Sequence, residues 1–210
     1  MDFTKTGCKD LDLLITGYPK NGISLIYGSG GSGKTTLCLM TADFNCKDKN
    51  VLYLDAGNNF SIERFEQISN KLNMNEVLIL KIKNFNEQHE QIKKLLEINS
   101  NSLIIIDSFT TFYRRLHSRK PEIANAMLNK QLKLLSQIAK NNIPIILTSE
   151  VYSDMKNGIL PIAKDILSKY CNTIIRLERN PRRLFVKKPV NCYFYFDIDN
   201  GGIKKKLGGI

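Results

Sequence analysis

A glycine-rich segment followed by a lysine and a threonine carries the clearest chemistry in the sequence. Residues 28–35 read Gly-Ser-Gly-Gly-Ser-Gly-Lys-Thr and satisfy the pattern G-x-x-x-x-G-K-[ST] in full. Glycines let the backbone curl until successive N–H groups point at phosphate oxygens, and the N-terminus of a following helix adds partial positive charge. Lys34 supplies a mobile cation for the β- and γ-phosphates, and the Thr35 hydroxyl is suited to ligate Mg²⁺. We therefore expect ATP to be held by Gly28, Ser29, Gly30, Gly31, Ser32, Gly33, Lys34, Thr35 and Thr36, with Lys34 also acting in catalysis.

An acid at the end of an apolar run is expected to complete a magnesium site. Residues 103–106 read Leu-Ile-Ile-Ile, and Asp107 follows them directly. In nucleoside triphosphatases with such a loop, a carboxylate at the end of a nearby buried strand holds the magnesium ion. The sequence therefore predicts Thr35 and Asp107 as the metal-binding residues.

The segments around these residues alternate between strand and helix patterns. Residues 23–27 are β-branched or apolar and precede the glycines, whereas 35–46 suit a helix, so the loop lies between a strand and a helix. Further strands are expected at 51–56, 77–82, 103–106 and 144–148, and helices at 61–72, 86–99 and 121–141. This order predicts an α/β fold with a mostly parallel, helix-covered sheet. Closely spaced runs at 173–177, 183–186 and 192–198 predict antiparallel edge strands near the C-terminus, and 204–206 are expected to form a solvated tail.

Length and composition favour one ordinary globular domain. The 210 residues are 42% apolar and 24% charged and contain no linker or repeat, so we expect residues 1–210 to form a single domain. The five cysteines lack a Cys-x-x-Cys pair, which argues against a zinc cage. No apolar run has the length of a signal peptide or a membrane span, so we expect no membrane association and a cytoplasmic location.

The charge balance favours a polyanionic partner. Lysine and arginine number 31 against 20 acidic residues, a net charge of +11 that attracts nucleic acid by Coulomb steering. The alternative is that frequent Lys, Asn and Ile reflect biased composition with solvated lysines. Charge alone does not decide between the two.

Several segments resemble a known family. Residues 27–35, 51–55, 103–110 and 145–148 are similar to the RecA-family recombinase core, and 150–154 with 165–179 are similar to its archaeal RadB-type paralogues. The resemblance covers nearly the whole chain and implies a RecA-like P-loop ATPase core. It further implies an accessory role in homologous recombination and DNA repair, with ATP, Mg²⁺ and DNA bound and the main recombinase or a Holliday-junction-resolving nuclease assisted. Because the sequence starts almost directly at the ATPase core, we expect no autonomous strand exchange.

Two departures from the family bear on hydrolysis. The family usually has a water-activating glutamate two positions after the strand that ends at Asp55, and this sequence has Gly57. Loss of a positioned base typically costs about a hundredfold or more in rate, so hydrolysis should be slow. The family's polar pair after the fifth strand appears as Ser149-Glu150, and our hypothesis is that Glu150 partly substitutes as the catalytic carboxylate. The alternative is a solvated acid at the start of a loop.

Other site residues are inferred from the same resemblance. Arg64 matches a position whose guanidinium packs on the adenine, although an exposed arginine at a helix start is the alternative. The stretch 114–120 matches the family's first DNA-facing loop, and Tyr152 to Leu160 matches the second, whose cation is Lys156. Two basic clusters are predicted to bind phosphates of single-stranded or branched DNA without reading sequence. They comprise Arg114, Arg115, Arg119 and Lys120, and Arg182, Arg183, Lys187 and Lys188, with a solvated surface as the alternative for each.

Two other functions remain open from the sequence. Regulatory ATPases or kinases of the clock-protein type share the fold and can carry a Thr-Ser-Glu strand end like residues 148–150, but they typically have paired acids where this chain has Gly57-Asn58. The second of these is a nucleotide-gated interaction module without DNA affinity. DNA binding separates the recombination and repair function from these two.

Overall fold

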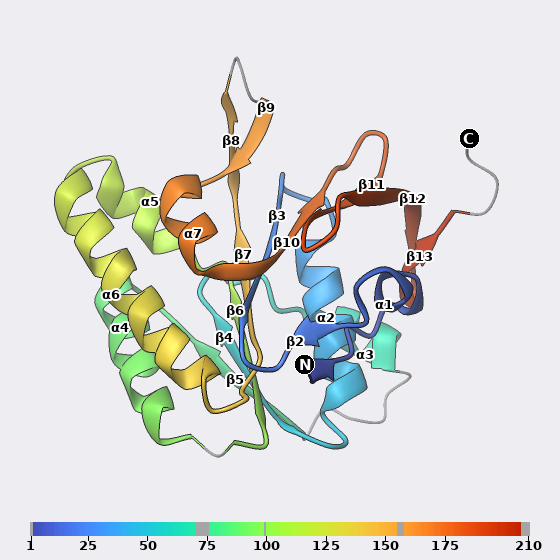
Figure 1. Cartoon of the computed structure of the whole chain (residues 1–210), viewed down its shortest axis with the longest axis horizontal. Helices are drawn as coiled ribbons and strands as arrows, with labels where there is room; N and C mark the ends of the chain where they lie inside the picture. Colours follow the sequence, from blue (N-terminus) through green and yellow to red (C-terminus); the bar gives the residue numbers. More distant parts are fainter. Residues whose placement is uncertain (1, 70–75, 99, 155–157, 207–210) are drawn as a thin grey trace.

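One large sheet organises the molecule. The computed structural model describes residues 2–69, 76–98, 100–154 and 158–206, and Figure 1 shows the strands passing between groups of helices. Nine strands pair in the order β13-β12-β11-β10-β3-β7-β6-β4-β5. Neighbours from β10 to β5 are parallel, whereas β10 to β13 are antiparallel. The predicted α/β class, with antiparallel strands at one edge, is confirmed.

The large sheet contains β3 (Ile23–Gly28), β4 (Asn50–Asp55), β5 (Val77–Lys81), β6 (Ser102–Asp107), β7 (Ile145–Ser149), β10 (Cys171–Leu177), β11 (Arg183–Lys188), β12 (Cys192–Asp199) and β13 (Gly202–Lys205). Two small antiparallel pairs are β1 (Phe3–Thr4) with β2 (Tyr18–Pro19), and β8 (Val151–Asp154) with β9 (Gly158–Pro161). The helices are α1 (Lys9–Ile15), α2 (Lys34–Asn45), α3 (Ile62–Ser69), α4 (Phe85–Lys94), α5 (Thr111–His117), α6 (Pro121–Ala139) and α7 (Lys164–Tyr170), with a 3₁₀ turn η2 at Leu95–Glu97.

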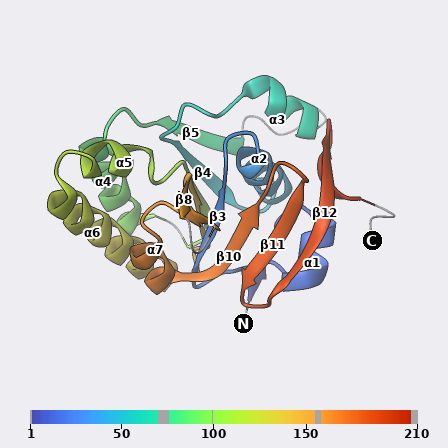
Figure 2. The same ribbon diagram turned by 90° about the horizontal axis from the view of Figure 1, so that it is seen from above.

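Helices cover both faces of the central strands. Every residue of β3 and β6 is buried, which explains why these strands are nearly continuous apolar runs. Helices α4 to α7 contribute to the hydrophobic cluster on one face, and α1 to α3 to the cluster on the other. Figure 2 shows the two helix groups on opposite sides of the sheet. The strand ends that carry polar residues are thereby fixed in a rigid frame.

Some expected elements differ from the observed ones. The helix expected at 86–99 ends at Lys94, and a 3₁₀ turn replaces its last part; Asn99 lies outside the described residues, as does the end of the helix expected at 61–72. The tail expected at 204–206 was wrong for Lys204 and Lys205, because these residues belong to β13, which pairs with β12; both are exposed to solvent, as expected. Ile203, the residue between Gly202 and Lys204, is 2% exposed. It anchors this strand in the core beside α2.

The antiparallel extension depends on its buried aromatic residues. Phe196 of β12 is 1% exposed and belongs to the cluster that α1 and α2 cover. Changing Phe196 to Ala should lower the free energy of unfolding by about 3–5 kcal/mol, because a large cavity replaces the ring. Phe44 on α2 is 54% exposed, and Phe44→Ala should change stability by less than about 0.5 kcal/mol. Urea denaturation monitored by circular dichroism measures both; equal losses in the two variants would contradict this packing.

Candidate nucleotide site

The phosphate loop joins β3 to α2 and depends on glycine at two positions in particular. A Cβ on Gly28 would lie 2.3 Å from the carbonyl oxygen of Leu177 and 2.5 Å from the Ser32 hydroxyl, so no larger residue fits. Gly33, the residue before α2, has φ of 107°, a backbone conformation that side chains rarely adopt. Both constraints allow the loop to turn sharply into the helix N-terminus, whose partial positive charge favours an anion.

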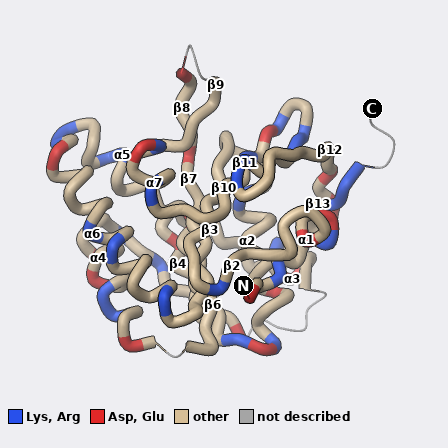
Figure 3. Tube along the Cα trace, viewed as in Figure 1, with Lys and Arg blue, Asp and Glu red and all other residues tan. Residues whose placement is uncertain are grey.

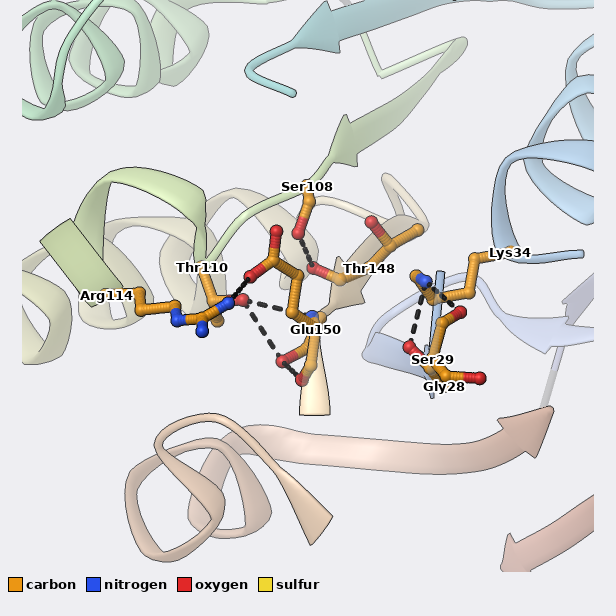
Figure 4. Close-up of polar contacts among 9 residues, drawn as sticks. Gly28, Ser29, Lys34, Ser108, Thr110, Arg114, Thr148 and Glu150 are labelled. Carbon is orange, nitrogen blue, oxygen red and sulfur yellow. Dashed lines mark hydrogen bonds and ion pairs between the residues drawn. The ribbon is translucent and has the colours of Figure 1, made fainter. Parts of the chain in front are cut away.

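Lys34 lies folded over the loop. Its ammonium donates to the carbonyl oxygens of Gly28 at 2.9 Å and Ser29 at 3.0 Å, as Figure 4 shows. Burial lowers the pKa of Lys34, while the carboxylates of Asp107 and Glu150 oppose that shift. A bound phosphate would favour the charged ammonium in the same way as these carboxylates. The lysine is therefore placed to exchange carbonyl partners for phosphate oxygens.

Asp107, at the end of β6, connects the start of α2 to the neighbouring strands β4 and β7. Its Oδ2 accepts hydrogen bonds from the Thr35 hydroxyl at 2.7 Å and the Tyr53 hydroxyl at 2.8 Å, and its Oδ1 accepts one from the Thr148 hydroxyl. The side chain of Asp107 is fully buried. Burial raises the pKa of Tyr53 well above its usual value, and Asp107 adds to this, so Tyr53 remains a donor at neutral pH. Thr35 and Asp107, predicted as the metal pair, are in direct contact and offer oxygen ligands that suit Mg²⁺.

A cavity of about 550 Å³ opens over the loop. Most of the predicted nucleotide-binding residues line it, namely Gly28, Ser29, Gly30, Gly31, Gly33, Lys34, Thr35 and Thr36. Ser32 and Arg64 are not among the lining residues. The Ser32 side chain is buried within the loop, and the Arg64 guanidinium donates to the carbonyl oxygens of Asp199 at 2.6 Å and Asn200 at 3.4 Å. Arg64 thus holds the turn after β12, the strand whose Ile198 lines the cavity, and its contact with adenine stays a prediction.

Gly57 stands at the position where the family usually has a glutamate. The backbone N–H of Gly57 donates to the carbonyl oxygen of Asp107, which holds this residue at the end of β4. The Asn59 side chain lies over it, since a Cβ on Gly57 would come 2.2 Å from Asn59 Nδ2. Asn59 also lines the cavity. An amide and a glycine therefore stand where the family has an acid, and neither is a general base.

Glu150 lies at the rim of the same cavity. Its Oε2 accepts from Arg114 Nη1 at 2.7 Å, and its backbone N–H donates to the Thr110 hydroxyl (Figure 4). Both side chains line the cavity, although Arg114 is 65% exposed and Glu150 39% exposed. Glu150 is thus an ion-paired acid facing the cavity rather than an isolated surface acid. Its role in hydrolysis remains a prediction.

The first predicted DNA cluster extends over a helix and the turn that follows it. Residues 114–117 belong to α5, so the loop expected there is helical at its start. Arg115 lies over the Phe112 ring at 5.5 Å, and Arg119 and Lys120 are exposed in the turn before α6. The four basic residues, Arg114 included, are exposed. The second expected loop is the β8–β9 hairpin, and Lys156 lies outside the described residues.

The second predicted cluster is divided between different surroundings. Arg182 donates to the Gly31 carbonyl oxygen at 3.3 Å and therefore lies against the phosphate loop. Lys188 donates to the Cys171 carbonyl oxygen, whereas Arg183 and Lys187 lie beside Phe185. Figure 3 shows basic positions on α4 and α6 as well as on β11, so they are not confined to one face. Of the four residues, only Arg183 and Lys187 therefore lie together, whereas Arg182 and Lys188 have separate partners.

Sequence reasoning missed several residues of the site. Tyr53 and Thr148, which hold Asp107, are buried residues in apolar strands, and only their polar oxygens on neighbouring strand ends could have signalled the contact. No pattern in the sequence marked Asn59 as a residue of the site. Among the described residues, no three or more His, Cys, Asp or Glu side chains gather in a way that could hold a metal ion. No helix in the described ranges is long and apolar enough to cross a membrane.

The fold and the loop define a class of protein. A mostly parallel sheet with helices on both faces, a phosphate loop after β3, and Asp107 at the end of β6 make this chain a protein of the RecA-like fold. A solved structure described as the RadB recombinase superposes with a TM-score of 0.83 at 30% identity and covers 97% of this chain and all of its own.

Sequence comparisons define the family within that class. The Rad51 family model matches residues 3–189. The DNA repair and recombination protein RadB of Thermococcus kodakarensis is 33% identical over 95% of this chain and 97% of its own length. The protein of the same name from Pyrococcus furiosus is 35% identical over 95% and 94%. The chain belongs to the Rad51 family, in its RadB group.

Proposed function

We propose that this chain is an ATP- and DNA-binding accessory protein of homologous recombination and DNA repair. It binds DNA independently of sequence, with single-stranded or branched DNA as the substrate, and hydrolyses ATP slowly. It does not exchange strands alone but assists the main recombinase or a nuclease that resolves branched junctions. Membership in the RadB group supports the pathway, since the relatives are named as DNA repair and recombination proteins.

The nucleotide part of the proposal depends on the loop and Asp107. Lys34 and Thr35, at the N-terminus of α2, line the cavity of about 550 Å³, and this supports phosphate binding there. Thr35 and Asp107, 2.7 Å apart, would hold Mg²⁺, which would neutralise phosphate charge. With Gly57 in place of the family's acid, the same site favours binding over hydrolysis, so ATP acts chiefly as a ligand that stabilises one conformation.

One contact carries the link between nucleotide and DNA. Arg114 lies on α5, the helix that begins the DNA-facing segment, and its guanidinium binds Glu150 at the rim of the nucleotide cavity. A phosphate group in the cavity would compete with Glu150 for this guanidinium. The DNA surface itself is proposed to consist of Arg114, Arg115, Arg119 and Lys120, and basic residues of β11 are proposed to contact DNA separately from it.

The family membership favours this function over a clock-protein-type ATPase or kinase. An interaction module that binds nucleotide but has no DNA affinity is distinguished by a direct DNA-binding measurement. Such a module would bind ATP in the same cavity and leave DNA unbound at low ionic strength.

We predict that removing Arg115 and Arg119 weakens binding to single-stranded and duplex DNA alike. Each arginine neutralises about one phosphate, so the double Ala variant should bind roughly tenfold more weakly and show a salt slope smaller by about two. Fluorescence anisotropy over a range of salt concentrations measures both quantities. The control changes Lys94 and Lys133, which are exposed on α4 and α6, to Ala and alters the net charge equally. Equal weakening by both variants, or binding that does not depend on salt, would contradict this surface.

A second prediction concerns the acid at the cavity rim. Glu150→Gln should lower ATP turnover about tenfold or more if the carboxylate orients the attacking water, with ATP affinity little changed. Arg114→Ala breaks the same ion pair but keeps the carboxylate, and should retain turnover within about threefold. Phosphate release under saturating ATP and Mg²⁺ provides the comparison. Unchanged turnover in Glu150→Gln, or an equal loss in the two variants, rules out this role.

A further inference from the structure

The strands β10 to β12 present one face that is rich in aromatic and cationic side chains. Their residues alternate between two faces, as expected for extended strands. The face toward α1 and α2 is apolar and buried and includes Ile175, Leu177, Leu184, Val186, Phe194 and Phe196. The opposite face, which we call the aromatic face, carries Arg176, Glu178, Arg183, Phe185, Lys187, Tyr193 and Tyr195.

The rings and cations of the aromatic face are stacked against one another. Phe185 pairs directly with Arg176 on β10 and with Tyr193 on β12. The Arg176 guanidinium lies over the Phe185 ring at 4.4 Å, and the Tyr193 ring lies 5.2 Å from it. Arg183 lies near the Phe185 ring at 5.1 Å and the Tyr195 ring at 6.0 Å. These contacts hold flat surfaces in place before any ligand arrives.

The helices that cover the central sheet do not extend over this face. The hydrophobic cluster under α4 to α7 reaches β10 mainly through Cys171 and the partly buried Ile174, and it includes no residue of β11 or β12. Tyr193 is 55% exposed. A hollow of about 180 Å³, lined by Tyr27, Ile174, Lys164 and Lys187 among others, opens where β10 meets α7. Figure 2 shows β10, β11 and β12 side by side, with α7 next to β10.

The charge of the aromatic face is positive. Arg176 and Arg183 bind the two oxygens of Glu178 at 2.7 and 2.8 Å, so the three groups carry one net positive charge. Lys187 adds another. Asp197, farther along β12, lies opposite Lys204 of β13. The net positive charge of the aromatic face therefore favours an anionic ligand.

We propose that the aromatic face binds single-stranded nucleic acid by stacking bases on Tyr193, Tyr195 and Phe185 while Arg183 and Lys187 contact the phosphates. The inference rests on the proposed DNA binding and adds to it a second surface and a preference for single strands. Bases of a duplex are already stacked on each other and hidden from such a face, whereas unpaired bases stack on exposed rings irrespective of sequence. A sheet face on which Tyr193 is 55% exposed and Phe185 and Tyr195 are partly exposed, with cations beside the rings, suits this ligand.

The test compares single-stranded and duplex DNA. A labelled oligothymidine and a labelled duplex of the same length are titrated with the full chain, and anisotropy is recorded. Tyr193→Ala should weaken oligothymidine binding about tenfold, as expected for one lost stacking partner, and change duplex binding less than twofold. Tyr193→Phe keeps the ring and should bind both ligands like the wild type. Phe44→Ala, which removes an equally exposed ring (54% against 55%) from α2, should also leave both affinities unchanged.

A spectroscopic readout tests stacking directly. The chain contains no tryptophan, so Tyr193→Trp introduces a single reporter. Oligothymidine should quench its emission under conditions where the duplex does not. Emission that is unchanged at saturating oligothymidine would overturn the proposal even if the affinity were altered.

Other outcomes separate this inference from the proposed function. If the wild type binds no DNA at low salt, the proposed function fails. If Tyr193→Ala binds both ligands normally while the Arg115 and Arg119 double variant does not, only the aromatic-face proposal fails. Sedimentation velocity without DNA completes the set: a wild-type dimer that Tyr193→Ala converts to monomer, with oligothymidine affinity intact, would identify the face as a contact between copies of this chain and overturn the proposal.

Discussion

The hydrogen bonds to the buried carboxylate of Asp107 are the interaction on which the rest of the structure depends. A carboxylate with no exposed surface is costly unless its oxygens are bound, and here the hydroxyls of Thr35, Tyr53 and Thr148 bind them. These three groups come from α2, β4 and β7, so one acid ties the phosphate loop to two neighbouring strands. The Asp107 carbonyl oxygen adds hydrogen bonds from Ala56 and Gly57 after β4. The loop, the oxygens of Thr35 and Asp107, and the end of β4 are therefore positioned as one unit.

The same unit explains why binding and hydrolysis can be separated. Holding phosphates requires the loop backbone, Lys34 and the Thr35–Asp107 pair, and all of these are in place. The acid that usually activates water in the family stands after the end of β4, where this chain has Gly57, which offers no base. Glu150 faces the cavity from the end of β7 but is paired with Arg114 of α5. This cavity-facing acid thus connects to α5, the helix proposed to face DNA, which would suit a nucleotide that works as a conformational ligand.

Much of the fold and the centre of the site were predictable from the sequence. Strand and helix patterns around the glycines fixed the α/β class, because apolar runs covered on both faces have few alternatives. Helix α5 was missed because it is short, with seven residues that include aromatics and a β-branched threonine, and its stability comes from Phe112 and Tyr113 in the core. Strand β13 was missed because two glycines precede and three lysines follow its single apolar anchor, Ile203. The opposite orientations of Arg182 and Arg183 follow from strand pairing and packing, which a run of basic residues does not reveal.

The loop and the Thr35–Asp107 pair are proposed to hold ATP together with Mg²⁺. Isothermal titration of ATP into the purified chain, with Mg²⁺ and with the metal chelated, tests this proposal most directly, and Lys34→Ala serves as the control for the phosphate loop. The account predicts that ATP binds, that chelation weakens binding about tenfold or more because the Thr35–Asp107 pair then holds no cation against the phosphates, and that Lys34→Ala binds weakly in both conditions. Absence of ATP binding, or equal affinity with and without Mg²⁺, would contradict it.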